Sequence, residues 1–259
     1  MDNAVVYGYG VVGKATAKAF NIPHYFDLKE ASITLKEAAY KRYHFFCLPT
    51  PTVNGLCYVE PIVGLIQQLE QLPHNQNVYI IRSTVIPGTS RFIQSSLGIN
   101  AIVSNPEFLT EATAEDDAIH PDIVVIGGDH KQYVDDVVGI YQGHLKSTPR
   151  LFTTDSITAE MAKYAVNTFY ATKVTFANQI FDVCQRVGAN YESIKNVMYG
   201  RKWVGANHLD VWHKGGRGVD GRCLRKDLDA FENYSKSKLL ETVKKINDEL
   251  LSKYPKKND

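Results

Sequence analysis

Short apolar runs alternate with helix-like stretches over the first half of the chain. The runs are AVVYG from Ala4, HYFD from His24, YHFFCLP from Tyr43, VYIIRST from Val78, NAIVSNP from Asn100 and DIVVIGG from Asp122. This alternation predicts an α/β fold with a doubly wound parallel sheet. Several runs are apolar throughout, which is typical of strands covered by helices on both faces.

The pattern changes after Pro149. From about Ser156 to Val187 the chain has the periodicity of one long helix with almost no breakers, and a glycine-rich loop with tryptophan follows from Tyr199 to Arg222. A last amphipathic helix is predicted from about Leu224 to Leu251. We therefore expect two domains, a sheet domain over residues 1–150 and an all-α domain, built on the long central helix, over residues 151–259.

Composition narrows the class of protein. Hydrophobic residues make up 44% and charged residues 22% of the 259 residues, and the formal net charge is +1. These values are typical of a globular protein and give no reason to expect a nucleic-acid partner. The start of the chain enters a strand at once, and no run of 18 apolar residues occurs, so we expect a cytoplasmic protein without a membrane partner. The four cysteines lack CxxC spacing, which predicts reduced thiols and no metal site.

A glycine motif follows the first predicted strand. Gly8, Gly10 and Gly13 form GxGxxG, with Val11 and Val12 between the last two, and Asp27 ends the second apolar run. Such glycines permit a tight turn, close approach of a pyrophosphate and tight helix packing, and an acid about 20 residues on binds the ribose hydroxyls. We therefore predict a Rossmann-type domain that binds NAD, and NAD in preference to NADP because a carboxylate repels a 2′-phosphate. The alternative is a glycine-rich turn with an incidental aspartate.

Two polar side chains share one face of the long helix. Lys163 and Asn167 are four residues apart, and Glu160 lies about one turn earlier on nearly the same side. An ammonium and a carboxamide can hold a substrate oxygen and stabilise an alkoxide or oxyanion. The alternative is a solvent-facing Glu160/Lys163 pair.

Cys223 lies just ahead of the last predicted helix. Gly218 and Gly221 precede it, and Arg222, Arg225 and Lys226 surround it. A helix start and neighbouring cations favour the thiolate, which is the nucleophilic form of cysteine. We therefore interpret Cys223 as a candidate nucleophile, with a buried, unreactive cysteine as the alternative.

Three polar loops each follow an apolar strand. They are Pro49-Thr50-Pro51, Ser83 to Thr89, and Asn105 to Glu111. An open α/β sheet binds its ligands at the carboxyl ends of the strands, so we expect these loops to share one sheet edge. Glu107 and Glu111 could act as bases on a water molecule that Thr84 orients. We expect Pro49, Thr50 and Thr84 beside the cofactor.

Together these residues resemble the UDP-glucose/GDP-mannose dehydrogenase family. The motifs occur in the same order from Gly8 to Asp227 and read GxGxxG, PTP, STVxPGT, NPEFLxE, AExxKxxxN and GxxGxCxxKD. The resemblance implies that Cys223 is the nucleophile, that Lys163 and Asn167 stabilise the oxyanion, and that Asp227 assists acid/base steps. It places Thr84, Glu107 and Glu111 on the water-activating and substrate side, and Lys226, Gly218 and Gly221 at the substrate.

The resemblance implies oxidation of a nucleotide sugar's primary alcohol to a carboxylate with two NAD, through a thiohemiacetal and a thioester on Cys223. By the resemblance, family members continue into a nucleotide-binding domain, and we expect this protein to lack it. One hypothesis is that Arg217, Arg222 and Arg225 bind the substrate's phosphates instead, because guanidinium groups pair with phosphate bidentately. The alternative is a solvated basic loop.

Two other functions remain open. A β-hydroxyacid dehydrogenase-like enzyme also joins a Rossmann domain to a helical domain with a KxxxN pair, but it needs no cysteine. A non-catalytic NAD-binding pseudoenzyme, or one half of a split enzyme, is the third possibility. The aromatic residues of the long helix, Tyr164, Phe169, Phe176 and Phe181, predict a homodimer through the helical domain.

Overall fold

The computed structural model describes residues 1–256 except 54, 75, 146 and 222. The chain forms two compact units. The first comprises Met1–Pro51 and Cys57–Lys163, and the second comprises Thr52–Leu56 and Tyr164–Asp259. The boundary between the two units lies within the long helix, between Lys163 and Tyr164. The strand Arg150–Thr154 and the first turns of the helix that begins at Ser156 therefore belong to the sheet unit.

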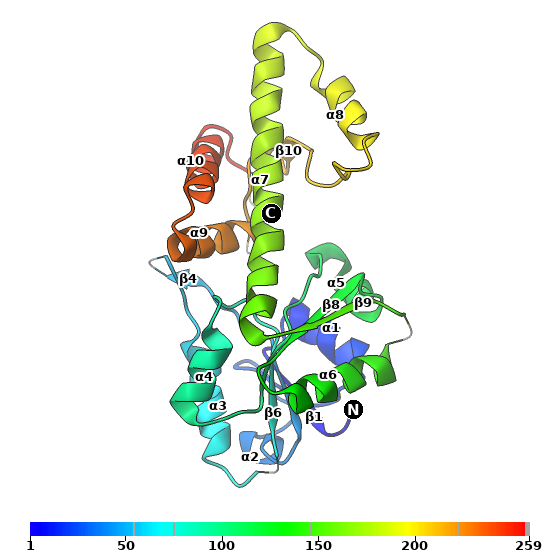
Figure 1. Ribbon diagram of the computed structural model, residues 1–259, viewed down its shortest axis with the longest axis vertical. Coiled ribbons are helices and arrows are strands. Elements are labelled where there is room, and N and C mark those ends of the chain that lie inside the picture. The colour runs from blue at the N-terminus through cyan, green and yellow to red at the C-terminus, as the bar shows by residue number, and fades with distance from the viewer. Residues whose placement is uncertain (54, 75, 146, 222, 257–259) are drawn as a thin grey trace. The chain divides into compact units, whose positions relative to one another are not determined.

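A seven-stranded sheet forms the centre of the first unit (Figure 1). Its spatial order is β2-β1-β3-β6-β7-β8-β9. The strands are β1 (Ala4–Tyr7), β2 (Tyr25–Phe26), β3 (Tyr43–Phe46), β6 (Val78–Ile81), β7 (Ile102–Ser104), β8 (Ile123–Gly127) and β9 (Arg150–Thr154). The strands from β2 to β7 are parallel, with Tyr7 opposite Phe46 and Phe46 opposite Ile81. The α/β fold class with a doubly wound sheet is confirmed.

The direction of β8 differs from the prediction, and β9 was not predicted because residues 151–259 were expected to be all-α. β8 runs antiparallel to β7, paired at Ser104 and Gly127, and β9 runs parallel to β8. A parallel neighbour requires a crossover of the sheet. The connection after β7 contains only the short helices η1 (Glu111–Thr113) and α5 (Ala114–Ile119). It does not cross to the opposite edge of the sheet, so β8 starts at the edge where β7 ends and runs in the opposite direction.

Helices cover both faces of this sheet. Alternate residues of β1 face opposite sides, with Val6 in a core beneath α1 (Val11–Ala19) and α6 (Lys131–His144). Val5 lies in the opposite core beneath α2 (Leu35–Ala38), α3 (Glu60–Glu70) and α4 (Thr89–Leu97). Coverage on both faces explains why the strands are apolar throughout.

The strand order reverses beside β1, because the chain runs outward to β2 and then crosses to β3 on the other side. Ligands of open α/β sheets bind at such a switch point, outside the carboxyl ends of the strands. Since β1, β3, β6 and β7 are parallel, the glycine loop and the three polar loops that follow these strands lie at one edge. The expectation of a shared edge is confirmed.

The long helix α7 (Ser156–Val187) has the predicted limits. It contains neither glycine nor proline and is followed by Gly188, which has a left-handed φ of 74°. The second unit also contains α8 (Tyr191–Tyr199), α9 (Leu224–Ser235) and α10 (Lys238–Lys253). Two short hairpins complete the described elements, β4 (Thr52–Val53) with β5 (Leu56–Cys57) and β10 (Trp212–His213) with β11 (Gly216–Arg217).

The prediction of one last helix from Leu224 to Leu251 is wrong. α9 ends at Ser235, and the φ of 52° of its C-cap residue Lys236 is left-handed. α10 begins at Lys238, and the hydroxyl of its N-cap residue Ser237 accepts from the Leu240 amide. A serine N-cap satisfies a helix-start amide, so this sequence can stop one helix and begin another. The amphipathic period continues across the break and conceals it.

Within the described residues, no helix combines the length and the apolar character that a membrane crossing requires.

Candidate functional site

Each glycine of the loop after β1 is required for a different structural reason. Gly8 has a φ of 86°, and a Cβ there would lie 2.6 Å from the Cys47 carbonyl oxygen. A Cβ on Gly13 would lie 1.9 Å from the carbonyl oxygen of Gly8. Both positions exclude every other residue type, as the turn and the helix packing require.

The third glycine lies beside open space. A Cβ on Gly10 would meet no atom within 4 Å, and Gly10 is the N-cap of α1, without a side chain that caps it. Val11 and Val12 follow as the first residues of α1, and Val11 is exposed. The first-turn amides at a helix start attract anions. This geometry fits a pyrophosphate close to the backbone.

Asp27 follows β2 and faces this loop. Its carboxylate accepts the Tyr9 amide at 2.7 Å and the Lys29 amide at 3.2 Å. The hydrogen bond from Tyr9 is the main cause that lowers the pKa of Asp27 below its usual range. Asp27 is therefore ionised and held beside the glycine loop, as a ribose-binding acid must be.

The loops after β3 and β6 are tied to each other. The Thr50 hydroxyl donates to the Thr84 carbonyl oxygen at 2.6 Å, and the Ser83 hydroxyl donates to the Leu48 carbonyl oxygen at 2.7 Å. Thr50 is buried, whereas Pro49 is exposed. These bonds hold the proposed cofactor-side residues at the sheet edge with little freedom.

Lys163 meets Glu107 from the loop after β7. Their Nζ and Oε1 atoms are 3.2 Å apart, and the side chains are 7% and 12% exposed. Glu107 Oε2 also accepts the Leu109 amide at 2.7 Å, and the Lys163 ammonium lies over the Phe108 ring. The structure thus joins two predicted catalytic residues, whereas Glu111 lies exposed on η1.

Glu160 is not part of a solvent-facing pair with Lys163, because both residues are buried. Its carboxylate accepts the amides of Gly88 at 2.6 Å and Ser90 at 2.8 Å, and the Ser90 hydroxyl at 2.7 Å. Burial raises the pKa of Glu160 above its usual range. Glu160 caps α4 and fixes the start of α7 to the STVIPGT loop.

In the second unit, Asn167 meets Asp227. The Asn167 carboxamide donates to Asp227 Oδ2 at 2.5 Å, and the Lys226 ammonium lies 2.7 Å from Oδ1. Asn167 and Asp227 are 5% and 1% exposed. Three residues chosen from the sequence therefore form one polar cluster at the start of α9.

Cys223 is exposed and is the N-cap residue of α9. The two glycines before it differ in their surroundings. A Cβ on Gly218 would lie 2.8 Å from Asn247 Oδ1, whereas a Cβ on Gly221 would meet no atom within 4 Å. Packing against α10 explains Gly218, and a substrate contact by either glycine stays a prediction.

Arg217 corrects the phosphate hypothesis. Its guanidinium is buried, where it donates to Asn178 Oδ1 at 2.8 Å and pairs with Asp182 at 2.8 Å. Three aromatic rings surround it, those of Phe181, Trp212 and Tyr254. The prediction that Arg217 binds substrate is wrong, because this charge holds the core of its unit together.

The other two arginines of the phosphate hypothesis are Arg225 and Arg222. Arg225 pairs with Asp229 at 2.9 Å and with Asp248 at 2.7 Å, so carboxylates already partner its charge. Arg222 lies outside the described residues.

A buried hydrogen-bond network that was not predicted from the sequence lies behind the Glu107 loop. Arg82 donates to Asn105 Oδ1 and to the Tyr141 hydroxyl, each at 2.7 Å, and Tyr141 donates to the same Asn105 oxygen at 2.8 Å. Asn105 and Glu107 belong to one loop, so Arg82 supports that loop from below. The only sequence signal was a charged residue directly after an apolar strand.

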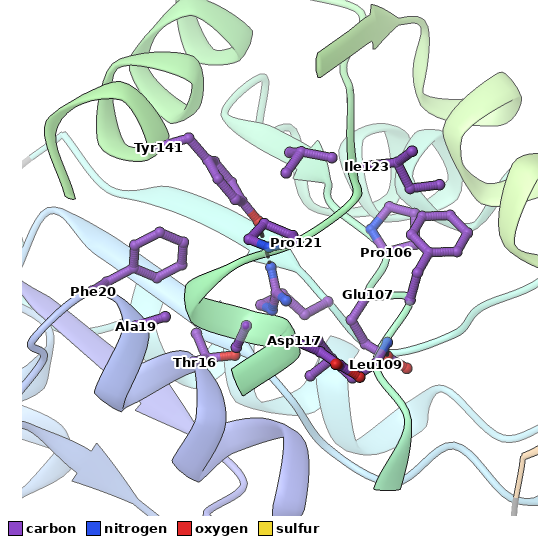
Figure 2. Close-up of a pocket in the computed structure, with 14 residues that line it drawn as sticks. Thr16, Ala19, Phe20, Pro106, Glu107, Leu109, Asp117, Pro121, Ile123 and Tyr141 are labelled. Atoms are coloured by element: carbon purple, nitrogen blue, oxygen red, sulfur yellow. Dashed lines mark hydrogen bonds between the residues drawn. The ribbon is translucent and has the colours of Figure 1, made fainter. Parts of the chain in front are cut away.

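Figure 2 shows Tyr141 beside a small cavity lined by residues of α1, α5 and the Pro106–Leu109 loop. The cavity of about 20 Å³ is large enough for one water molecule. Among the described residues, Arg82 Nε is buried without a hydrogen-bond partner, so a water molecule here would satisfy it. This space is too small for a substrate.

Two family models match the chain. Residues 26–145 match the NAD binding domain of the UDP-glucose/GDP-mannose dehydrogenase family, and residues 157–249 match its central domain. The UDP-glucose 6-dehydrogenase of Rickettsia bellii (strain RML369-C) is 31% identical over 216 residues, which are 79% of this chain and 49% of that protein. The chain thus spans about half the length of the curated relatives it matches.

Solved structures share the fold. A UDP-glucose dehydrogenase from Pyrobaculum islandicum aligns with a TM-score of 0.84 at 22% identity, over 96% of this chain and 68% of that one. Mycobacterium tuberculosis 3-hydroxyisobutyrate dehydrogenase aligns with a TM-score of 0.74 at 13% identity, over 98% and 95%. The matched domains and the glycine-loop geometry agree that the first unit binds NAD, and the chain belongs to the UDP-glucose/GDP-mannose dehydrogenase family.

Proposed function

We propose that this protein oxidises the primary alcohol of a nucleotide sugar such as UDP-glucose to the carboxylate, with NAD as the oxidant. One observation carries the proposal. Helix α7 holds an ammonium and a carboxamide four residues apart, and each is fixed by a carboxylate with little exposure, Lys163 by Glu107 and Asn167 by Asp227. Paired donors held in this way suit an oxygen that gains negative charge.

The first oxidation converts the alcohol to an aldehyde. NAD, when bound, accepts one hydride from the reacting carbon in each of the two oxidations. The Asp27 carboxylate and the amides after Gly10 would hold the cofactor's ribose and pyrophosphate. Lys163 and Asn167 stabilise the alkoxide as the hydroxyl proton passes to water.

The second oxidation needs a covalent intermediate. The Cys223 thiolate adds to the aldehyde carbon, and the oxygen takes a proton to give a thiohemiacetal. Loss of a hydride from that carbon and of the hydroxyl proton leaves a thioester. Exposure of Cys223 at the start of α9 supports this role.

Hydrolysis completes the reaction. A water molecule loses a proton to a carboxylate and attacks the thioester, and the thiolate leaves. Asp227 and Glu107 are the candidate bases, and Thr84 and Glu111 lie on loops of the substrate side by the resemblance. Per sugar, two hydrides leave the reacting carbon and would reduce two NAD, one water is consumed, and one carboxylate is formed.

The test is NADH formation across a panel of nucleotide sugars, with the sugar acid measured by mass spectrometry. We expect two NADH per sugar for the wild type and no acid for Cys223→Ser. Cys184→Ser is the matched control in the same unit and should keep the activity. Acid formation by Cys223→Ser at the wild-type rate would contradict the covalent mechanism.

A second candidate is a single oxidation of a β-hydroxyacid. It is favoured by the fold alignment with 3-hydroxyisobutyrate dehydrogenase, which extends over 95% of that shorter chain. One NADH per substrate, independent of Cys223, would support it. Stable NAD binding without turnover of any substrate would instead indicate a pseudoenzyme or one half of a split enzyme.

We also infer a homodimer through the helical unit. Phe169, Phe176 and Val183 are 59%, 51% and 42% exposed on α7 and recur every seven residues, so they form one apolar stripe. Such stripes favour a partner surface. Sedimentation of the wild type should give a dimer and of Phe169→Glu/Phe176→Glu a monomer. A monomeric wild type at micromolar concentration would contradict the inference.

A further inference from the structure

The loop that carries Cys223 is held at its first end by Asn247 of α10. The Val219 amide donates to Asn247 Oδ1 at 2.5 Å, and Asn247 Nδ2 donates to the Val219 carbonyl oxygen at 2.9 Å. Val219 is 3% exposed and Asn247 is fully buried. One carboxamide therefore satisfies both backbone groups of Val219, as a neighbouring strand would.

The first turn of α9, which follows the loop, is held by the next residue of α10. Asp248 Oδ1 lies 2.7 Å from the Arg225 guanidinium, and Arg225 also pairs with Asp229 one turn along α9. Cys223 thus lies between two anchors, four residues after Val219 and two before Arg225. Both anchors come from adjacent residues of one helix.

Gly218 completes the contact. Its φ of 89° is left-handed, and a Cβ there would lie 2.8 Å from Asn247 Oδ1 and 3.3 Å from the Leu250 Cβ. Any other residue would push Asn247 away from Val219. Gly218 and the Asn247 carboxamide are therefore packed directly against each other.

We infer that Asn247 and Asp248 are positioning residues that set the place and reactivity of Cys223. Neither touches the reacting atoms, and both act through the loop between them. A nucleophile displaced by about 1 Å reacts on the order of 100-fold more slowly. This inference rests on the proposed function for its effect on turnover, but its effect on the thiol does not depend on turnover.

The experiment measures alkylation of Cys223 by iodoacetamide against pH, followed on the Cys223 peptide by mass spectrometry. We expect Asn247→Leu and Gly218→Ala to change the alkylation rate at least about threefold and to shift the pH midpoint, because the thiol leaves the start of α9. Asp248 is half-exposed, so Asp248→Asn should fold normally. It should change the alkylation rate and the pH midpoint in the same direction as the other two variants, but by less.

Two variants of α10 serve as controls. Leu240→Ala removes a buried side chain, and Lys244→Gln removes ion pairs to Asp229 and Glu232, but neither residue holds an end of the loop. Both should leave the alkylation profile unchanged. If the wild type turns over a nucleotide sugar, kcat of Asn247→Leu should fall about 10-fold or more, with KM for NAD within about twofold.

An alkylation profile of Asn247→Leu, Gly218→Ala and Asp248→Asn equal to that of the wild type overturns the inference. The same result follows if Leu240→Ala changes the profile as much as they do. A changed profile in a protein that oxidises no nucleotide sugar upholds the positioning role and rejects the proposed function instead.

Discussion

Lys163 and Glu107 form an ion pair that is almost closed to solvent, with Nζ and Oε1 3.2 Å apart and side chains 7% and 12% exposed. Glu107 is fixed further by the Leu109 amide. A buried pair contributes little compared with apolar residues of the same volume, but the loss of one partner strands the other charge. The pair therefore contributes more to the orientation of the Lys163 ammonium in a site than to the stability of the fold.

Lys163→Met should lower the free energy of unfolding by about 3 kcal/mol, because Glu107 is left buried without its counter-ion. Urea denaturation of the protein without ligands measures this. The Lys163→Met/Glu107→Leu double variant should recover at least about 1 kcal/mol relative to the sum of the single changes. Strict additivity would contradict the pairing.

His44 should make stability depend on pH. It is fully buried, with Nδ1 2.8 Å from the Tyr7 hydroxyl and Nε2 2.9 Å from the Lys41 carbonyl oxygen, and burial lowers its pKa from 6.5 to about 4. The unfolded chain therefore binds the proton first, and stability falls as the pH drops from about 6.5 to about 4, by about 3 kcal/mol in total.

The measurement is the denaturation midpoint between these pH values, in the wild type and in His44→Gln. The variant should lack this part of the pH dependence, although it is less stable at pH 7. Equal slopes for the two proteins would show that other groups cause the acid sensitivity.

Glu160→Ala should destabilise the first unit by about 2 kcal/mol. The change leaves the Gly88 and Ser90 amides without the carboxylate that caps α4. Thermal unfolding measures it against Glu115→Ala, which removes an exposed ion pair with Lys18 and should cost under about 1 kcal/mol. Similar losses in both variants would refute the capping role.

Arg217→Gln should be strongly destabilising and should not act as a phosphate-binding variant. The change empties a buried position between three aromatic rings and leaves Asp182 without its partner, at a cost of about 3 kcal/mol. Arg225→Gln, in the same unit but with a side chain that is 28% exposed, should cost much less. A selective loss of nucleotide-sugar affinity in Arg217→Gln, with unchanged unfolding, would restore the phosphate role.

Local patterns determined much of this protein. Six of the seven strands of the sheet, the limits of α7 at Ser156 and Val187, and the glycine loop with Asp27 follow from the order of apolar residues and breakers, whereas β9 was not predicted. Such features depend on the neighbours along the chain, so the sequence displays them directly. The grouping of the polar loops at one edge follows as well, because parallel strands end on the same side.

The tertiary structure decided which groups meet. It paired Glu107 with Lys163, placed the Glu160 carboxylate at the amides of the start of α4, and buried Arg217 among aromatic rings. It also reversed β8 and divided the last helix at Ser237. The side chains involved have partners up to 72 residues away, and the burial that selects a charge's partner exists only after the chain has folded.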